Sequence, residues 1–316
     1  MISLFIGGCP RSGTTMLGSL LGAHPRGVSL PESQFKVEAM RGGVIDASAK
    51  TRAHRLRHLL RSHRFTGWHQ AFSKVKAEDL EEASYRQQID LLVSAYIATI
   101  GKEDADFVVD DTPSNKNFFL TLSELYPEAR FIHIIRDGRA VANSVLQRDW
   151  GPNTSLLAAY WWQYHLAHGL AAEKSLGPER VLRVRYEDVL DDPQGELAKI
   201  CSWHGIEYSE RMLEPVANTL DVRAAAFNPL AKRGPQPERA HAWRDTLSSR
   251  QVEVFESATG DMLSYLGYET HFGAGARSAS KRELVLAGAK ELIKGAINIP
   301  LYYFRRQWLK HRVASE

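Results

Sequence analysis

Residues 2–22 constrain the fold of this chain more than any other stretch. An apolar run, Ile2-Ser3-Leu4-Phe5-Ile6, leads into the glycine-rich sequence GGCPRSGTT at residues 7–15. Apolar residues at helical spacing then continue from Thr14 to Gly22. This order predicts a buried strand, a tight turn and a helix that begins at the carboxyl end of the strand. Such a helix N-terminus attracts anions, because its first N–H groups have no partners within the helix.

The turn resembles a Walker A loop, G-x-x-x-x-G-K-[ST], that lacks its lysine. Gly8 and Gly13 occupy the two glycine positions, and Thr14 stands where the lysine should be. Arg11 lies inside the loop, and its guanidinium can bind two oxygens at once. Thr15 occupies the position of the Mg²⁺-binding hydroxyl, but no clear Walker B carboxylate follows an apolar strand. The loop therefore either binds a phosphate-like group without a metal or only forms a tight turn.

Strand and helix patterns alternate along the rest of the chain. Strands are predicted at residues 28–30, 107–109, 130–135 and 180–186, and helices from residue 114 onward and at 137–148, 155–175 and 193–204. This alternation predicts an α/β fold with a central parallel sheet flanked by helices, similar to P-loop proteins. Residues 36–105 lack strand patterns and predict a helical insert. We therefore expect a domain over residues 1–275 and a basic amphipathic tail over 276–316.

A second anion site is predicted where the strand at 130–135 ends. Arg136 follows this strand, and Ser144 and Arg148 come eight and twelve residues later in the sequence FIHIIRDGRAVANSVLQRDW. Both spacings return to nearly the same face of a helix. A surface helix with scattered arginines explains this segment alone equally well. However, two anion sites at the carboxyl ends of two strands in one sheet favour ligand binding over the surface-helix explanation.

Composition narrows the functional classes. The formal net charge of +3 is too small to indicate a nucleic-acid partner by itself. Two cysteines, Cys9 and Cys201, do not form a disulfide scaffold and fit a reducing compartment. No signal-peptide pattern is present, and the apolar run from Gly295 to Phe304 is too short to cross a bilayer. We expect a cytoplasmic protein.

Residues 10–15, PRSGTT, resemble the 5′-phosphosulfate loop of sulfotransferases, and Arg136 with Ser144 resembles their 3′-phosphate site. The resemblance runs from residue 2 to about residue 270, interrupted by the insert. It implies 3′-phosphoadenosine 5′-phosphosulfate (PAPS) as the donor, contacts from Arg11, Ser12, Gly13, Thr14 and Thr15, and transfer without a metal. A sulfuryl group carries less negative charge than a γ-phosphoryl group, so the Walker lysine is not needed.

The chain is closer to the tyrosylprotein and bacterial branch of this family than to the cytosolic small-molecule branch. Glu32, just past the strand at 28–30, resembles the glutamate that serves as general base in the tyrosylprotein branch. Arg148 and Tyr186 resemble that branch's phosphate and nucleoside contacts. One departure is clear: where that branch carries a catalytic lysine before Pro113, this chain has Asp110-Asp111-Thr112. Lys116 lies nearby, but in a different register.

The leading hypothesis is thus a PAPS-dependent sulfotransferase that modifies a hydroxyl group on a glycan, lipid, small molecule or peptide tyrosine. The alternatives are a P-loop kinase or nucleotidase with an unusual loop, and a non-catalytic nucleotide-binding protein. A requirement for a metal distinguishes the kinase or nucleotidase from the sulfotransferase. Turnover of an acceptor distinguishes both enzymes from the binding protein.

The tail combines basic and apolar residues. Leu284, Val285, Leu292 and Ile293 are spaced for one helical face, and a cluster of aromatic residues lies at 302–308 beside arginines. Such a pattern is typical either of peripheral contact with an anionic membrane or of a C-terminal helix that packs on the domain.

Overall fold

We describe the protein from a computed structural model, which defines residues 2–41, 44–62, 65–148, 150–214, 236–294 and 296–297. The strands in these residues are β1 (Ile2–Gly8), β2 (Gly27–Ser29), β3 (Phe107–Asp110), β4 (Arg130–Ile135) and β5 (Val181–Arg185). They form one sheet in the order β2-β3-β1-β4-β5, and every neighbouring pair is parallel. The predicted α/β fold with a central parallel sheet is confirmed.

The chain divides into two compact units. The first comprises residues 1–135 and 168–237, and the second comprises residues 136–167 and 238–316. The division falls inside the long helix α9 (Ser155–Leu176). All the strands of the sheet belong to the first unit. Each unit is described by itself below.

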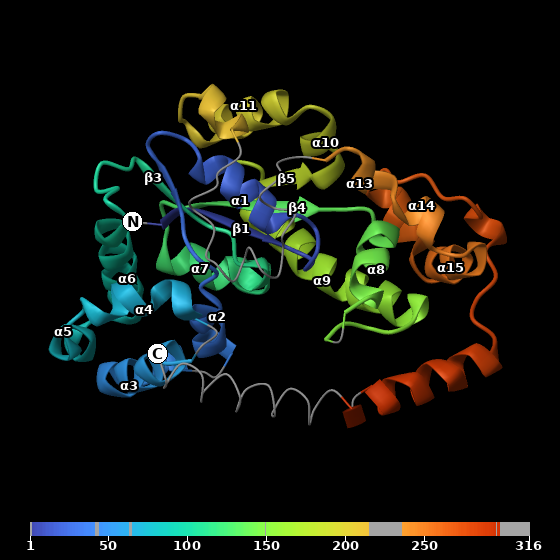
Figure 1. Cartoon of the computed structure of the whole chain (residues 1–316), viewed down its shortest axis with the longest axis horizontal. Coiled ribbons are helices and arrows are strands. Elements are labelled where there is room, and N and C mark those ends of the chain that lie inside the picture. The colour runs from blue at the N-terminus through green and yellow to red at the C-terminus, as the bar shows by residue number, and fades with distance from the viewer. Residues whose placement is uncertain are drawn as a thin grey trace. The chain divides into compact units, whose positions relative to one another are not determined.

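The first unit places helices on both sides of the sheet, with α11 on one side and α7 on the other (Figure 1). Its helices are α1 (Thr14–Gly22), α2 (Gln34–Arg41), α3 (Ala49–Leu60), α4 (Thr66–Ser73), α5 (Ala77–Glu82), α6 (Tyr85–Ile100), α7 (Phe119–Leu125), α10 (Tyr186–Asp191) and α11 (Pro193–His204), with short 3₁₀ turns η1 (Val44–Asp46), η3 (Pro113–Phe118) and η4 (Glu210–Leu213). Helices α2–α6 occupy the strand-poor segment, which confirms the expectation of a helical region at 36–105.

The core of this unit explains why β1 is apolar at nearly every position. The sheet is covered on both faces, so alternation of polar and apolar residues is not required. Phe5 of β1 stacks on Phe131 of β4 at 5.5 Å and also contacts the ring of Tyr126 at 5.4 Å. In the insert, Trp68 of α4 lies edge-on to Phe35 of α2 at 5.2 Å. The insert therefore belongs to the same hydrophobic core as the sheet.

The sheet register brings three chain segments to one edge. Gly8, at the end of β1, pairs with Ile134 of β4, while Ser29 at the end of β2 pairs with Val109 of β3. The chain stays parallel for one residue beyond β2, since the Leu30 N–H donates to the Val109 carbonyl at 2.9 Å. The loop after β1 and the segments after β2 and β3 thus begin at the carboxyl edge of the sheet, where ligands bind in such folds.

The second unit is helical. It contains α8 (Gly138–Leu146), the N-terminal part of α9, α13 (Glu238–His241), α14 (Trp243–Thr246), α15 (Ser249–Tyr265), the 3₁₀ turn η6 (Gly273–Gly275) and a helix over residues 281–294. A small apolar cluster joins Ala140 of α8 to Trp243, Leu247 and Val252. Within the described residues, no helix has both the length and the apolar character needed to span a membrane.

Candidate active site

The loop after β1 has the backbone of an anion site. Arg11 adopts φ 73° and Gly13 adopts φ 95°, both in the left-handed region that non-glycine residues rarely occupy. The Ser12 N–H closes the turn on the Cys9 carbonyl at 3.0 Å. Helix α1 then starts at Thr14 with no side chain capping it and no acidic residue in its first turn. Its N–H groups and positive dipole end are therefore available to a negatively charged ligand.

Ser12 gives independent support for a bound ligand at this loop. Its side chain is buried, and among the described residues no group forms a hydrogen bond with its Oγ. A buried hydroxyl without a partner costs free energy. A phosphate or sulfate oxygen in the loop would supply the missing acceptor. The predicted Ser12 contact therefore fits an anionic ligand.

Tyr186 packs directly on the loop. A Cβ added at Gly13 would lie 2.4 Å from Cδ2 of the Tyr186 ring. Tyr186 is buried and begins α10 immediately after β5. Two of the predicted donor contacts, the Gly13 turn and Tyr186, are thus brought together by the fold. Gly13 is required here both for its positive φ and for this close approach.

Glu32 lies at the same edge of the sheet and is exposed. Its neighbour Ser33 fixes the segment, since the Ser33 N–H donates to Thr112 Oγ1 at 2.8 Å and its hydroxyl bonds to Asp110. From the insert, the indole N–H of Trp68 donates to the Glu32 carbonyl at 3.2 Å. The backbone of Glu32 is therefore held on both sides while its carboxylate remains accessible.

A buried ion pair lies beneath this segment. Lys36 and Asp110 are both fully buried, with Nζ 3.3 Å from Oδ2, and Lys36 also donates to Asn115 Oδ1 at 2.5 Å. Burial opposes the charge on Asp110, yet Lys36 and hydrogen bonds from Ser33, Asn115 and Thr112 hold the pKa of Asp110 below its usual range. Breaking such a pair leaves an uncompensated buried charge. Sequence reasoning missed Lys36, although a lysine between Phe35 and Val37 was a visible signal.

Asp111 occupies the position at which the sequence departs from the tyrosylprotein pattern. It packs against α1, because a Cβ added at Gly18 would meet the Asp111 side chain at 2.6 Å. Burial and the nearby carboxylates of Glu32 and Asp110 raise the pKa of Asp111 well above its usual range. Asp111 therefore keeps its proton to a higher pH than an ordinary carboxyl.

Lys116 lies on the other side of the loop, in η3. Its backbone N would be 2.5 Å from a Cβ at Gly7, and its Nζ donates to the Pro113 carbonyl at 3.3 Å. Burial lowers the pKa of Lys116 from 10.5 to about 8, and the positive charge of Arg41 lowers it further. The first unit thus has a buried lysine beside the loop, but not at the position of the family's catalytic lysine.

In the second unit, Arg136 is fixed at both ends. The indole N–H of Trp162 donates to the Arg136 carbonyl at 3.1 Å, and Arg136 Nη2 donates to the Arg239 carbonyl at 3.0 Å. Ser144 lies on α8. The helix ends at Leu146, so the expectation that Arg148 continues this helical face is wrong: Arg148 lies in the turn beyond it. Its Nε is buried and, in the described part of the chain, donates to no hydrogen-bond acceptor.

The start of α8 is held by charged groups that sequence reasoning did not single out. Asp137 caps the helix by accepting from the Arg139 N–H at 2.9 Å, and it binds the Arg139 guanidinium through both carboxylate oxygens at 3.0 and 2.8 Å. Arg139 also donates to Glu256 of α15 at 2.5 Å and lies 4.2 Å from the Trp243 ring centroid. The two arginines of the sequence RDGR at 136–139 therefore differ in role. Arg139 stabilises the start of α8, whereas Arg136 is the residue predicted to bind an anion.

Trp243 is a core residue of the second unit. It is buried, and it belongs to the apolar cluster with Ala140. The Arg139 guanidinium lies over its ring, so Trp243 packs against the start of α8.

Comparison with known proteins shows similarity in sequence and in fold. A family profile described as "Sulfotransferase family" matches residues 3–210. Protein-tyrosine sulfotransferase 2 of Gallus gallus is 28% identical over 225 residues, covering 66% of this chain and 53% of that protein. Nodulation protein NoeE of Sinorhizobium fredii is 27% identical over 290 residues, covering 84% of this chain and 65% of that protein. The chain thus spans between half and two thirds of the length of these two relatives.

Among solved structures, the sulfotransferase domain of the Synechococcus PCC 7002 olefin synthase superposes with a TM-score of 0.64 at 23% identity, covering 85% of this chain and 95% of that one. At this identity the likeness concerns the fold. The profile, by contrast, covers the loop, the segment around Glu32, the end of β4 and Tyr186. The chain belongs to the sulfotransferase family.

Proposed function

We propose that this protein transfers a sulfuryl group from PAPS to a hydroxyl acceptor, with Glu32 as the general base. The observation that carries the proposal is the loop at residues 8–15: an uncapped helix N-terminus, a strained Arg11 and a buried Ser12 hydroxyl that lacks a partner among the described residues. This combination suits a tetrahedral anion with several oxygens.

In this proposal the loop holds the 5′-phosphosulfate end of the donor. Backbone N–H groups of the first turn of α1, the hydroxyls of Thr14 and Thr15 and the guanidinium of Arg11 surround that end. Arg136, Ser144 and Arg148 bind the 3′-phosphate, and Tyr186 contacts the nucleoside. The half-buried side chain of Arg148 supports this role, because its Nε has a hydrogen to donate.

Glu32 removes the proton from the acceptor hydroxyl as the acceptor oxygen forms its bond to sulfur. The bond between sulfur and the bridging phosphate oxygen breaks, and negative charge develops on that phosphate oxygen. The α1 N–H groups, the threonine hydroxyls and Arg11 stabilise this charge. Neighbouring Asp111 retains its proton to higher pH than an ordinary carboxyl, so a negative Glu32 faces less repulsion than two ionised carboxylates would create.

The acceptor is a hydroxyl on a peptide tyrosine, glycan, lipid or small molecule. The name of the Gallus gallus relative supports a peptide tyrosine. However, the chain has aspartate where the tyrosylprotein branch carries a catalytic lysine before Pro113. This departure keeps glycans, lipids and small molecules among the candidate acceptors. Assays with one acceptor of each class therefore form part of the test.

Donor use is tested by thermal unfolding with 3′-phosphoadenosine 5′-phosphate and with AMP, which lacks the 3′-phosphate. Saturation at about 100 Kd stabilises a protein by roughly 2.7 kcal/mol. We expect stabilisation by the bisphosphate in the presence of EDTA, and a much smaller effect of AMP. Equal effects of the two nucleotides would contradict a separate 3′-phosphate site, and a requirement for Mg²⁺ would favour a kinase.

The role of Glu32 is tested with Glu32→Gln, which keeps the shape of the side chain but cannot accept the proton. We expect unchanged binding of 3′-phosphoadenosine 5′-phosphate and a loss of transfer on the order of 10²-fold or more, as is typical of a general base. Wild-type turnover in this variant would refute the assignment. Nucleotide binding without turnover of any acceptor by the wild type would favour a non-catalytic binding protein.

A further inference from the structure

The helix over residues 281–294 is turned so that both of its carboxylates and one of its lysines face its own unit. Its half-buried or buried positions are Glu283, Ala287, Glu291 and Lys294. Spacings of four, four and three residues place these side chains on one face. An ordinary surface helix buries its apolar stripe and exposes its charges. This helix instead turns two carboxylates and a lysine inward and leaves its large aliphatic side chains exposed.

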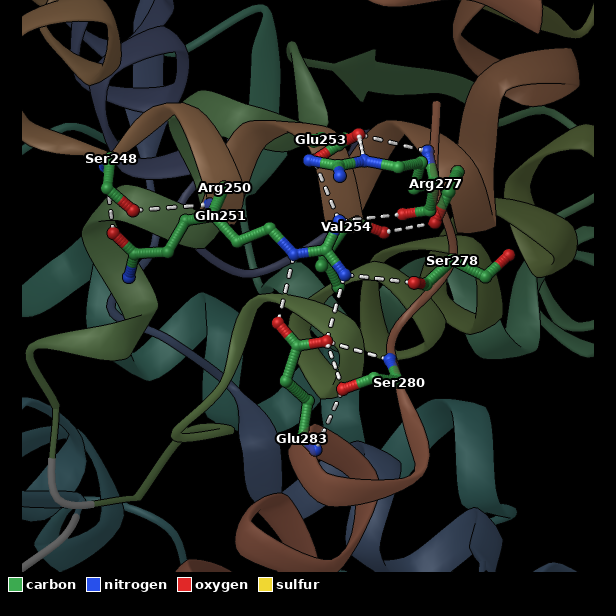
Figure 2. Close-up of polar contacts among 10 residues, drawn as sticks. Ser248, Arg250, Gln251, Glu253, Val254, Arg277, Ser278, Ser280 and Glu283 are labelled. Atoms are coloured by element: carbon green, nitrogen blue, oxygen red, sulfur yellow. Dashed lines mark hydrogen bonds and ion pairs between the residues drawn. The ribbon is translucent and has the colours of Figure 1, made fainter. Parts of the chain in front are cut away.

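Polar contacts fix this orientation at the N-terminal end of the helix. Figure 2 shows Arg250 of α15 between two carboxylates: it donates to Glu283 through Nε at 2.9 Å and Nη2 at 2.8 Å, and to Glu253 through Nη1 at 2.7 Å. It also donates to the carbonyls of Arg277 and Ser278 at 3.0 and 2.9 Å. Every N–H of this guanidinium is thus used, and the bidentate geometry holds Glu283 inward.

Glu283 also caps the helix that it anchors. The Ser280 N–H donates to Glu283 Oε2 at 2.7 Å, and the Glu283 N–H donates to Ser280 Oγ at 3.3 Å (Figure 2). This reciprocal pair is a capping box. Hydrogen bonds from Arg250 and from the backbone and hydroxyl of Ser280 lower the pKa of Glu283 to about 2. The anchor therefore persists through the physiological pH range.

The C-terminal end of the helix is fixed in the same way. The Asn153 N–H donates to Glu291 at 3.0 Å, and Lys294 donates to the carbonyls of Arg148 at 2.7 Å and of Gly151. Both ends are therefore attached to other parts of the second unit. A rotation that buried the apolar side would break all of these contacts.

The outward side of the helix is aliphatic. Val285 is 72% exposed and Leu292 is 78% exposed, and the other large exposed residues are Leu284, Leu286, Ile293 and Ile297. Ala289 is exposed as well. We call these exposed residues the aliphatic face. A group of exposed aliphatic side chains of this kind marks an interaction site.

The charged side chains that remain exposed on this helix are all positive. Both of its carboxylates, Glu283 and Glu291, are engaged by the unit, whereas Lys281, Arg282 and Lys290 are exposed. The sequence beyond Ile297 adds Arg305, Arg306 and Lys310, which lie outside the described residues together with the aromatic cluster at 302–308. An anionic surface complements this distribution.

From this geometry we infer that the aliphatic face and its exposed basic residues dock on the surface of an anionic lipid bilayer, with the helix in the plane of the interface. An aliphatic side combined with lysine and arginine is the signature of interfacial helices. Protein interfaces, by contrast, are enriched in aromatic residues and methionine, and the aliphatic face contains neither. The docking would place the enzyme at the surface of a membrane.

Vesicle co-sedimentation of the full chain tests the proposal. One set of vesicles contains phosphatidylcholine alone and the other contains phosphatidylcholine mixed with phosphatidylserine. We expect binding to the mixed vesicles. Val285→Gln combined with Leu292→Gln should abolish it, and Lys281→Gln, Arg282→Gln and Lys290→Gln together should lower the partition coefficient on the order of 100-fold.

Leu120→Gln is the matched control, because Leu120 is an exposed leucine of α7, 46% accessible, outside the aliphatic face. It should bind like the wild type. Failure of the wild type to bind mixed vesicles, or undiminished binding by the Val285/Leu292 variant, would overturn the proposal. Two further results would also overturn it: a lower melting temperature of that variant without vesicles, which indicates packing within the chain, and a concentration-dependent dimer that the variant abolishes.

Discussion

Lys116 provides a sharp test of how the loop region is built. Its side chain is 2% exposed, and burial lowers its pKa from the ordinary 10.5 to about 8. At neutral pH the folded protein therefore carries a buried ammonium group whose charge is disfavoured. Arg41 is its charged neighbour, and burial together with Lys116 lowers the pKa of His168. Replacing Lys116 with methionine removes the charge while retaining a side chain of similar length.

The sign of the pH effect follows from the direction of the shift. Between the folded and unfolded pKa values, the unfolded chain holds a proton on Lys116 that the folded chain has lost, so rising pH stabilises the fold. One pKa unit corresponds to about 1.4 kcal/mol, so the shift from 10.5 to about 8 gives a gain of roughly 2 to 3 kcal/mol between about pH 7 and pH 10. Lys116→Met should lack this gain.

Denaturant unfolding of wild type and Lys116→Met across this pH range measures the effect, because contributions of all other groups cancel in the difference. The wild type should gain stability relative to the variant as the pH rises. Lys199→Met, at a lysine whose side chain is 54% exposed, serves as the control and should show parallel curves. Parallel curves for Lys116→Met would refute the burial argument.

Three further predictions concern the loop and its support. Gly13→Ala should lower the free energy of unfolding by more than the roughly 1–2 kcal/mol that a left-handed residue costs. The reason is that the new Cβ would lie 2.4 Å from the Tyr186 ring. Gly101→Ala, at φ 64° with open space around it, is the control that measures the backbone cost alone. Ser12→Ala should raise the stability of the free protein, because it removes a buried hydroxyl without a partner among the described residues. It should weaken binding of 3′-phosphoadenosine 5′-phosphate about fivefold, the effect of losing about 1 kcal/mol from one hydrogen bond. Calorimetric titration measures this affinity, and unchanged affinity would contradict a ligand contact at Ser12. Trp68→Phe removes the N–H that binds the Glu32 carbonyl, so turnover should fall about fivefold at unchanged nucleotide affinity; a matching loss of affinity would point to general misfolding instead.

Local sequence patterns were enough to predict the elements that line the site. The helix at Thr14–Gly22 and the helix at Pro193–His204 have the predicted bounds, because a glycine turn and a proline at the first helical position mark their beginnings. The alternation of strand and helix patterns predicted parallel pairing, because a helix between two strands returns the chain to the same edge of the sheet. The residues of the loop also predicted its chemistry, since an anion site at a helix N-terminus depends on neighbouring backbone groups.

The contacts between distant segments could not be predicted in this way. Lys36 pairs with Asp110 across 74 positions of sequence only because α2 passes beneath the end of β3. The bond from Trp68 to Glu32 likewise depends on how the insert packs on the sheet. Sequence spacing carries no information about such pairs. The strength of such a pair also depends on how far burial removes water from both partners, which only the folded structure determines.

The sequence by itself thus determined the fold class, the loop and the residue types at the edge of the sheet, because these depend on local periodicity and on glycine conformation. It also showed that the tail is both basic and apolar. Only the tertiary structure decided which side of the tail helix faces outward. Arg250 and the backbone at 148–153 bind Glu283, Glu291 and Lys294, and those contacts, made by segments far apart in the chain, leave the aliphatic residues exposed.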